Sequence, residues 1–91
     1  MGLRQTFQFK ADSPEVVRCF LRSLAPLASL DERAPEFFVF THADGEPEFT
    51  FDCELTSQGI ISERAGEYFG FLGRFVEALT GHFGAVAMED A

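Results

Sequence analysis

The stretch 37-FFVFTHADGEPEFTFDCEL-55 decides the fold. It opens with the β-forming run 37–41, continues with turn residues centred on Asp44-Gly45, and ends in segment 48–55, where apolar and polar residues alternate. An Asp-Gly pair supplies the positive φ that a tight reversal needs. Alternation with a period of two is typical of a half-buried strand. The stretch therefore predicts a β-hairpin with a loop of about five residues.

Toward the N-terminus, the alternating segment 3–11 predicts a strand with one polar face. A helix start follows, in which Asp12 or Ser13 can serve as the cap and Pro14 suits the first helical position. Pro26 removes a backbone hydrogen bond, so the helix should kink or break near Leu24. Segment 31–35 is interpreted as a loop.

Toward the C-terminus, apolar residues at helical spacing predict a second helix over 62–80, and glycines follow it. Segment 83–88 is a candidate for a short last strand, and 89–91 for a frayed acidic tail. Whether 83–88 forms a strand is left open. With it, the order is βαββαβ, which predicts one α+β domain over 1–88, a two-layer sandwich with a ferredoxin-like antiparallel sheet and two helices on one face. That plan places the first strand parallel to segment 48–55, with Arg4 beside Glu48.

Composition excludes several classes of protein. The 91 residues include 15 acidic and 7 basic side chains, for a net charge of −8, which argues against direct binding to nucleic-acid phosphates. No apolar run reaches the roughly 18 residues of a membrane span. The N-terminus lacks the apolar region of a signal peptide, and two cysteines are too few for a disulfide scaffold. We therefore expect a small acidic protein of the cytoplasm.

The acidic charge is concentrated in one segment. Between Asp31 and Glu54 lie eight acidic residues and one basic residue, so this segment has −7 of the net charge of −8. Such a surface is suited to docking a basic partner through long-range attraction, or, in a sharper version, to mimicking a nucleic-acid backbone. The plain alternative is a solvated sheet face that prevents edge pairing. The predicted partner-binding acids are Asp44, Glu46, Glu48, Asp52 and Glu54.

Phenylalanine is unusually frequent, with 12 residues. In the run Phe37–Phe40, strand alternation turns either Phe37 with Val39 or Phe38 with Phe40 away from the helices, and the choice between the pairs stays open. We name Phe38 and Phe40 as the apolar anchor for a partner or a second copy of the chain.

Three glycines, Gly66, Gly70 and Gly73, fall on one side of the predicted second helix. Each costs about 0.8–1 kcal/mol relative to alanine in a helix interior, so close packing against another backbone is one explanation. Tolerated surface glycines are the other.

Signals for chemistry are weak. His42, Asp44 and Glu46 make a poor cation site, His82 is suited to a helix end, and Cys53 has the parity of a core residue. Cys19, near two arginines, is the remaining reactive candidate. We predict no catalytic residues, no metal and no cofactor.

These observations predict a non-enzymatic protein-interaction module, such as an adaptor, inhibitor or regulatory subunit, that docks a basic protein surface or a second copy of itself. The alternative is a dimeric regulatory domain that binds a small molecule in a pocket lined by phenylalanines. A third class is a small enzyme that uses His42 or Cys19.

Overall fold

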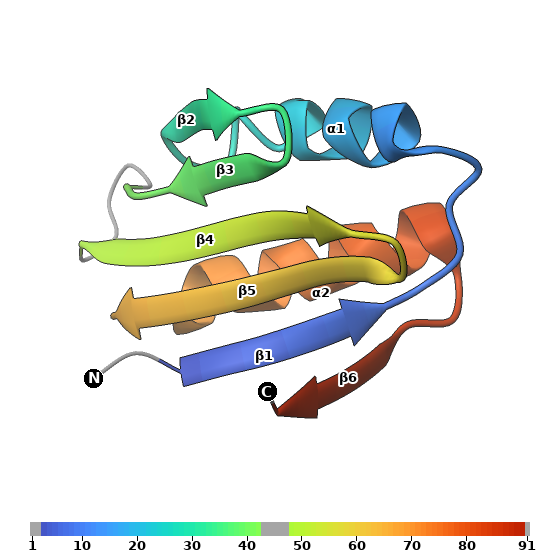
Figure 1. The fold of residues 1–91 in the computed structure, drawn as a ribbon. Helices are drawn as coiled ribbons and strands as arrows, with labels where there is room; N and C mark the ends of the chain where they lie inside the picture. Colours follow the sequence, from blue (N-terminus) through green and yellow to red (C-terminus); the bar gives the residue numbers. More distant parts are fainter. Residues whose placement is uncertain (1–2, 43–47, 91) are drawn as a thin grey trace.

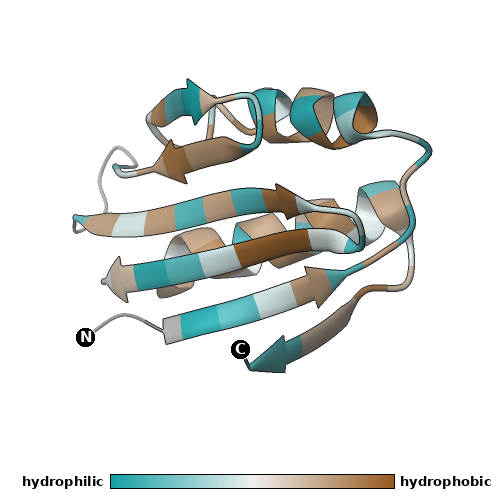
Figure 2. Ribbon diagram, in the orientation of Figure 1, coloured by the Kyte–Doolittle hydropathy of each residue, from teal (hydrophilic) through white to brown (hydrophobic). Residues whose placement is uncertain are grey.

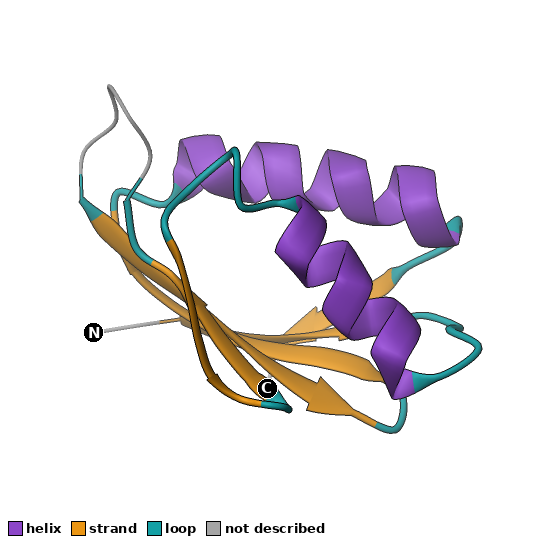
Figure 3. Ribbon diagram, turned by 90° about the horizontal axis from the view of Figure 1, so that it is seen from above, coloured by secondary structure: helices purple, strands orange, loops and turns teal. Residues whose placement is uncertain are grey.

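The computed structural model describes residues 3–42 and 48–90, which form an antiparallel sheet and two helices (Figure 1). The elements in chain order are β1 (Leu3–Gln8), α1 (Pro14–Ser23), β2 (Leu30–Ala34), β3 (Phe37–Phe40), β4 (Phe49–Thr56), β5 (Gly59–Gly66), α2 (Phe69–Phe83) and β6 (Ala87–Asp90). The six strands lie in the order β2-β3-β4-β5-β1-β6. Both helices lie on the same side of the sheet (Figure 3). The α+β class predicted from the sequence is confirmed.

The predicted hairpin is present as β3 and β4. The two strands pair antiparallel, with Phe38 opposite Cys53 and Phe40 opposite Phe51. Its turn, 43–47, lies outside the described residues. In β4, the alternation of apolar and polar residues coincides with the alternation of more buried and more exposed positions. The apolar residues therefore face the helices and the polar residues face away.

The first helix also follows the prediction. Ser13 is the cap, and its hydroxyl accepts a hydrogen bond from the backbone N–H of Val16 at 3.4 Å. Pro14 occupies the first helical position, and α1 ends at Ser23, one residue before Leu24. Its buried residues pack against the sheet and α2.

Two predictions of local structure are wrong. Segment 31–35, interpreted as a loop, belongs mostly to the edge strand β2. The second helix does not start at Ser62: residues 59–66 form β5, a central strand hydrogen-bonded to β4 and β1, and α2 begins at Phe69. The end of α2 agrees better with the prediction that glycines follow the second helix. Gly84, at φ 81°, follows the last residue of α2 and donates its N–H to the carbonyl oxygen of Thr80.

The ferredoxin-like strand order is not confirmed. β1 lies between β5 and β6 and runs antiparallel to both, so it does not pair with β4, and Arg4 is opposite Glu63 rather than Glu48. The predicted last strand exists but spans Ala87–Asp90. It includes two residues expected in the frayed tail, because Glu89 pairs with Thr6 and Asp90 with Gln5. Ala91 lies outside the described residues.

Aromatic rings fill the space between the helices and the sheet face toward them, called here the inner face. Phe71 and Phe75 of α2 form the centre of this core. Phe71 contacts the rings of Phe40, Phe49 and Phe51, and Phe75 contacts those of Phe7, Phe20 and Phe51. Each buried ring removes about 150–250 Å² from water, so these rings supply much of the burial in a small fold. Neither described helix is long and apolar enough to cross a membrane.

Candidate functional site

The sheet face turned away from the helices, called here the outer face, gathers acidic side chains from several strands. The strand register aligns two rows across it. One row contains Asp31, Val39, Asp52, Glu63 and Arg4, and the other contains Phe37, Glu54, Ile61, Thr6 and Glu89. Teal and brown bands alternate along β4, as expected of a strand with one polar face (Figure 2). No described helix covers this face (Figure 3).

Two carboxylates oppose each other at the centre of the outer face. Asp52 of β4 is paired directly with Glu63 of β5, and like charges in such a cross-strand pair are destabilising. Partial burial and then the charge of Glu63 raise the pKa of Asp52, while Arg33 acts in the opposite direction. The sheet therefore holds an unfavourable acidic pair that basic neighbours offset only in part: Arg33, which also donates to Asp31 at 2.9 Å, and Arg4, which is paired with Glu63.

An apolar residue lies within this acidic row. Val39 of β3 is opposite Asp31 on one side and Asp52 on the other, and only 3% of its surface is exposed. In the neighbouring row, Phe37 and Ile61 are half-buried on either side of Glu54. The outer face thus combines negative charge with a partly exposed apolar centre.

The prediction that Phe38 and Phe40 form an apolar anchor is wrong. Both rings are fully buried on the inner face, where Phe40 lies 4.9 Å from the ring of Phe71. Because alternate residues of a strand face opposite ways, Phe37 and Val39 occupy the outer face instead. Of these two, Phe37 is half-buried and Val39 is almost fully buried.

The predicted acids are placed as follows. Glu48 and Glu54 are exposed and Asp52 is half-buried, with Asp52 and Glu54 side by side in adjacent rows of the outer face. Asp44 and Glu46 lie outside the described residues. The structure adds Asp31 and Glu63, which the sequence interpretation missed because it assigned their segments to a loop and a helix.

The predicted close-packing glycines do not share a helix face. Gly66 ends β5 with φ at 79°, and a Cβ there would lie 2.8 Å from the carbonyl oxygen of Glu48, so this glycine serves a strand contact. Gly70 and Gly73 are exposed on α2. A Cβ at Gly73 would meet nothing within 4 Å among the described residues.

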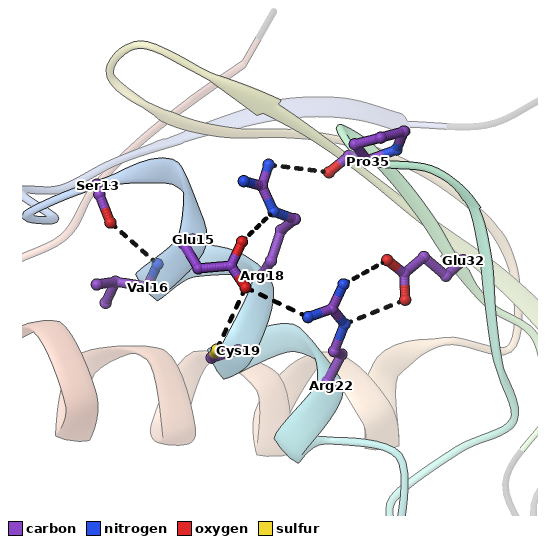
Figure 4. A network of polar contacts seen from close by, with 8 residues as sticks. All are labelled: Ser13, Glu15, Val16, Arg18, Cys19, Arg22, Glu32 and Pro35. Carbon is purple, nitrogen blue, oxygen red and sulfur yellow. Dashed lines mark hydrogen bonds and ion pairs between the residues drawn. The ribbon is translucent and has the colours of Figure 1, made fainter.

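An ion-pair network holds the edge strand β2 against α1 (Figure 4). Arg22 donates from Nε and Nη2 to the two carboxylate oxygens of Glu32, at 3.1 and 2.7 Å, and its Nη1 lies 3.5 Å from Glu15. Arg18 donates to Glu15 at 2.8 Å and to the carbonyl oxygen of Pro35 at 3.4 Å. Hydrogen bonds from these arginines lower the pKa of Glu15 and of Glu32. The network positions β2 and therefore Asp31 on the outer face.

Two of the candidates for chemistry, Cys19 and His82, line one pocket between α1 and the end of α2 together with Glu15, whereas Cys53 and His42 lie elsewhere. Cys53 is fully buried, and burial raises its pKa well above the ordinary range of a thiol. Cys19 is exposed on α1 and its thiol donates to Glu15 at 3.8 Å. His82 lies in the last turn of α2 against Phe83, while His42 is exposed after β3. In residues 3–42 and 48–90, no group of three or more metal-ligating side chains is found.

A groove of about 1160 Å³ lies at one end of the sheet, between the end of β1, the turn after β4 and the segment before β6. The rings of Phe9 and Phe83 lie in its wall, 4.5 Å apart. Its other lining residues are Gln8, Lys10, Ala11, Asp12, Ser57, Gln58, Ala85, Val86 and Ala87. The groove is mixed in polarity and wide open to solvent.

Comparisons with protein-family models, curated proteins and solved structures give no match for this chain.

Proposed function

We propose that this protein is a non-enzymatic interaction module whose outer sheet face docks a basic surface of a partner protein. The observation behind the proposal is the row formed by Asp31, Val39, Asp52 and Glu63. It joins four adjacent strands on a face that no described helix covers. The free cysteines fit a reducing compartment, so the proposed location is the cytoplasm.

Electrostatics favour a basic partner over a second copy of the same face. A net charge of −8 makes two outer faces repel each other, whereas a Lys- or Arg-rich surface is attracted over distances of about 10 Å at 0.1 M salt. A cation placed between Asp52 and Glu63 would also remove their mutual repulsion. Such complementarity raises association rates more than it raises affinity.

The apolar centre gives the surface a place where a partner can be held. Binding energy in protein interfaces is concentrated in a few desolvated apolar or arginine side chains, surrounded by polar contacts. Phe37 and Ile61 are half-buried and flank Glu54, so a partner arginine could pair with the carboxylate while its stem covers the two apolar side chains. The proposal therefore expects an arginine-rich contact.

Association kinetics with an identified partner test the proposal. The double charge reversal Asp52→Lys with Glu54→Lys should slow association at least tenfold at low salt, and the wild-type rate should fall steeply as salt rises. A matched control changes the net charge equally at Asp12, which is exposed before α1, and at Glu77, which is exposed on α2. Equal association rates for the two double variants would count against the proposed surface.

The groove beside Phe9 and Phe83 supports a second candidate function, the binding of a small molecule by a regulatory domain. Two adjacent aromatic rings with nearby amide side chains suit a planar ligand that also forms hydrogen bonds. In that case, Phe83→Ala should abolish ligand-induced thermal stabilisation, and charge reversal at Asp52 should leave it unchanged.

A further inference from the structure

A single arginine is buried on the inner face, among the aromatic rings. Arg64 of β5 is 2% exposed, although an arginine is rarely buried unless it is paired. Its guanidinium carbon lies 4.9 Å from the ring centre of Tyr68 and 5.8 Å from that of Phe51. These contacts favour a cation but provide no hydrogen-bond acceptors in the guanidinium plane.

Most of the hydrogen-bonding capacity of Arg64 is unused. Nη2 donates to Oε1 of Gln5 on β1 at 2.7 Å. Nε and Nη1 have no partner among the described residues, and neither has the hydroxyl of Ser62, two residues earlier on the same inner face. A guanidinium has five N–H donors and no acceptor, so Nε and Nη1 leave three N–H groups unpaired.

The N-terminus of α2 adds further donors beside this arginine. Tyr68, whose ring stacks on the guanidinium, is also the cap residue of α2, and its side chain makes no capping hydrogen bond. The first turn of this 15-residue helix contains no acidic residue. An uncapped N-terminus presents free backbone N–H groups and a partial positive charge, which favour anions.

The structure supplies too few acceptors for these donors. The carboxylate of Asp90 on β6, opposite Gln5, favours the charge of Arg64, but it is exposed, and no hydrogen bond or ion pair joins the two side chains among the described residues. Leaving a buried charged donor unpaired is strongly unfavourable, so a group rich in oxygen acceptors would be stabilising at this position. In a protein of net charge −8, Arg64 and the N-terminus of α2 thus form a local region of positive charge.

We propose that Arg64, Ser62 and the N-terminus of α2 form a binding site for a small oxyanion, the carboxylate or phosphate group of a small molecule. The rings of Tyr68 and Phe69 lie 4.7 Å apart, and Phe69 is 69% exposed. They form an aromatic rim, so a ligand with an apolar body behind its anionic group fits best.

Nuclear magnetic resonance on the whole chain tests this site directly. Sodium benzoate, sodium acetate and sodium phosphate are titrated at constant ionic strength, with sodium chloride as the reference. We expect saturable shifts of the Arg64 Nε–H signal and of the 69–71 amides. Tighter saturation by benzoate or acetate identifies a carboxylate site, and tighter saturation by phosphate identifies a phosphate site. If all three salts behave like chloride, the donors are satisfied by water and the proposal is wrong.

Variants separate this site from general charge effects. Arg64→Met should abolish the saturable shifts of the 69–71 amides, while Arg4→Met, which removes the same charge from an exposed outer-face position, should retain them. Unchanged binding by Arg64→Met would overturn the proposal.

A second variant keeps the arginine in place. Gln5→Glu puts a carboxylate where Gln5 already accepts from Arg64, so an internal anion replaces the external one. Anion affinity should fall at least tenfold and the melting temperature should rise. Wild-type anion affinity in Gln5→Glu would also contradict the site.

Discussion

The two faces of one sheet treat charge in opposite ways. On the inner face, a single cation, Arg64, is buried among aromatic rings. On the outer face, carboxylates are arranged around the apolar Val39, and the pair Asp52 and Glu63 stays in place despite its repulsion. Both arrangements reduce stability locally, and local violations of folding rules concentrate at functional sites. The difference between the faces therefore underlies the two proposals, docking of a basic protein on the outer face and binding of a small anion on the inner face.

The largest expected difference lies between two adjacent phenylalanines. Phe38→Ala should lower the free energy of unfolding by about 3–5 kcal/mol, because its ring is fully buried on the inner face. Phe37→Ala, on the outer face, should lower it by much less, since that ring is half-buried. Urea unfolding of both variants measures the difference. Equal losses would contradict the assignment of faces in β3.

Replacing the buried cation should stabilise the ligand-free protein. Arg64→Met keeps most of the side-chain volume and removes the unpaired donors, so unfolding free energy should rise by about 1–3 kcal/mol. Chemical denaturation in a chloride buffer measures this change. A clear loss of stability would instead indicate that the stacking with Tyr68 and Phe51 outweighs the unpaired donors.

On the outer face, Asp52→Asn should raise the free energy of unfolding by about 0.2–1 kcal/mol at pH 7, because it removes the repulsion from Glu63. The folded state raises the pKa of Asp52, so its destabilising effect is present above that raised value. The gain in unfolding free energy from Asp52→Asn should shrink as the pH falls through this raised pKa, and it should be absent below the ordinary pKa of 3.8. Glu54→Gln, opposite Phe37 and Ile61, is the control and should change little. A gain independent of pH would exclude the electrostatic explanation.

The smallest effect is expected at the exposed network beside β2. Glu32→Gln should reduce stability slightly at pH 7 and low salt, because exposed ion pairs contribute little. Arg22 lowers the pKa of Glu32, so the contribution is present above the ordinary value of 4.5 and is lost as the pH falls through the lowered one. Thermal melts at several pH values, with Glu36→Gln as the control, measure it. A difference that persists at pH 2 would contradict this origin.

The sequence predicts the elements whose side chains alternate or have a clear cap. In β4, alternate residues are buried phenylalanines and Cys53, and in α1 the cap Ser13 and the break near Leu24 are explicit. The acidic outer face follows from the alternation of β4, so Asp52 and Glu54 could be placed on it before the structure was known.

The sequence interpretation assigned β5 to a helix and β2 to a loop, and each error has a physical reason. In β5, the inner residues Ser62 and Arg64 are polar although buried, so the strand lacks the contrast between faces that identifies a strand. In β2, only Leu30 and Ala34 are partly buried, because this is an edge strand held through Arg22 and Glu32. Without β2 and β5, the predicted sheet pairs β1 with the wrong neighbour. The segment that misled the sequence interpretation contains the proposed anion site.

The central claim, docking through the outer face, is tested most directly by comparative capture from source lysate. The wild type, the Asp52→Lys/Glu54→Lys variant and the Asp12→Lys/Glu77→Lys control are immobilised at equal density, eluted with rising salt and analysed by mass spectrometry. The account predicts one basic protein that is stoichiometric on the wild type and the control, released by salt, and lost from the outer-face variant. Equal retention on all three, or no basic protein on any, would contradict it.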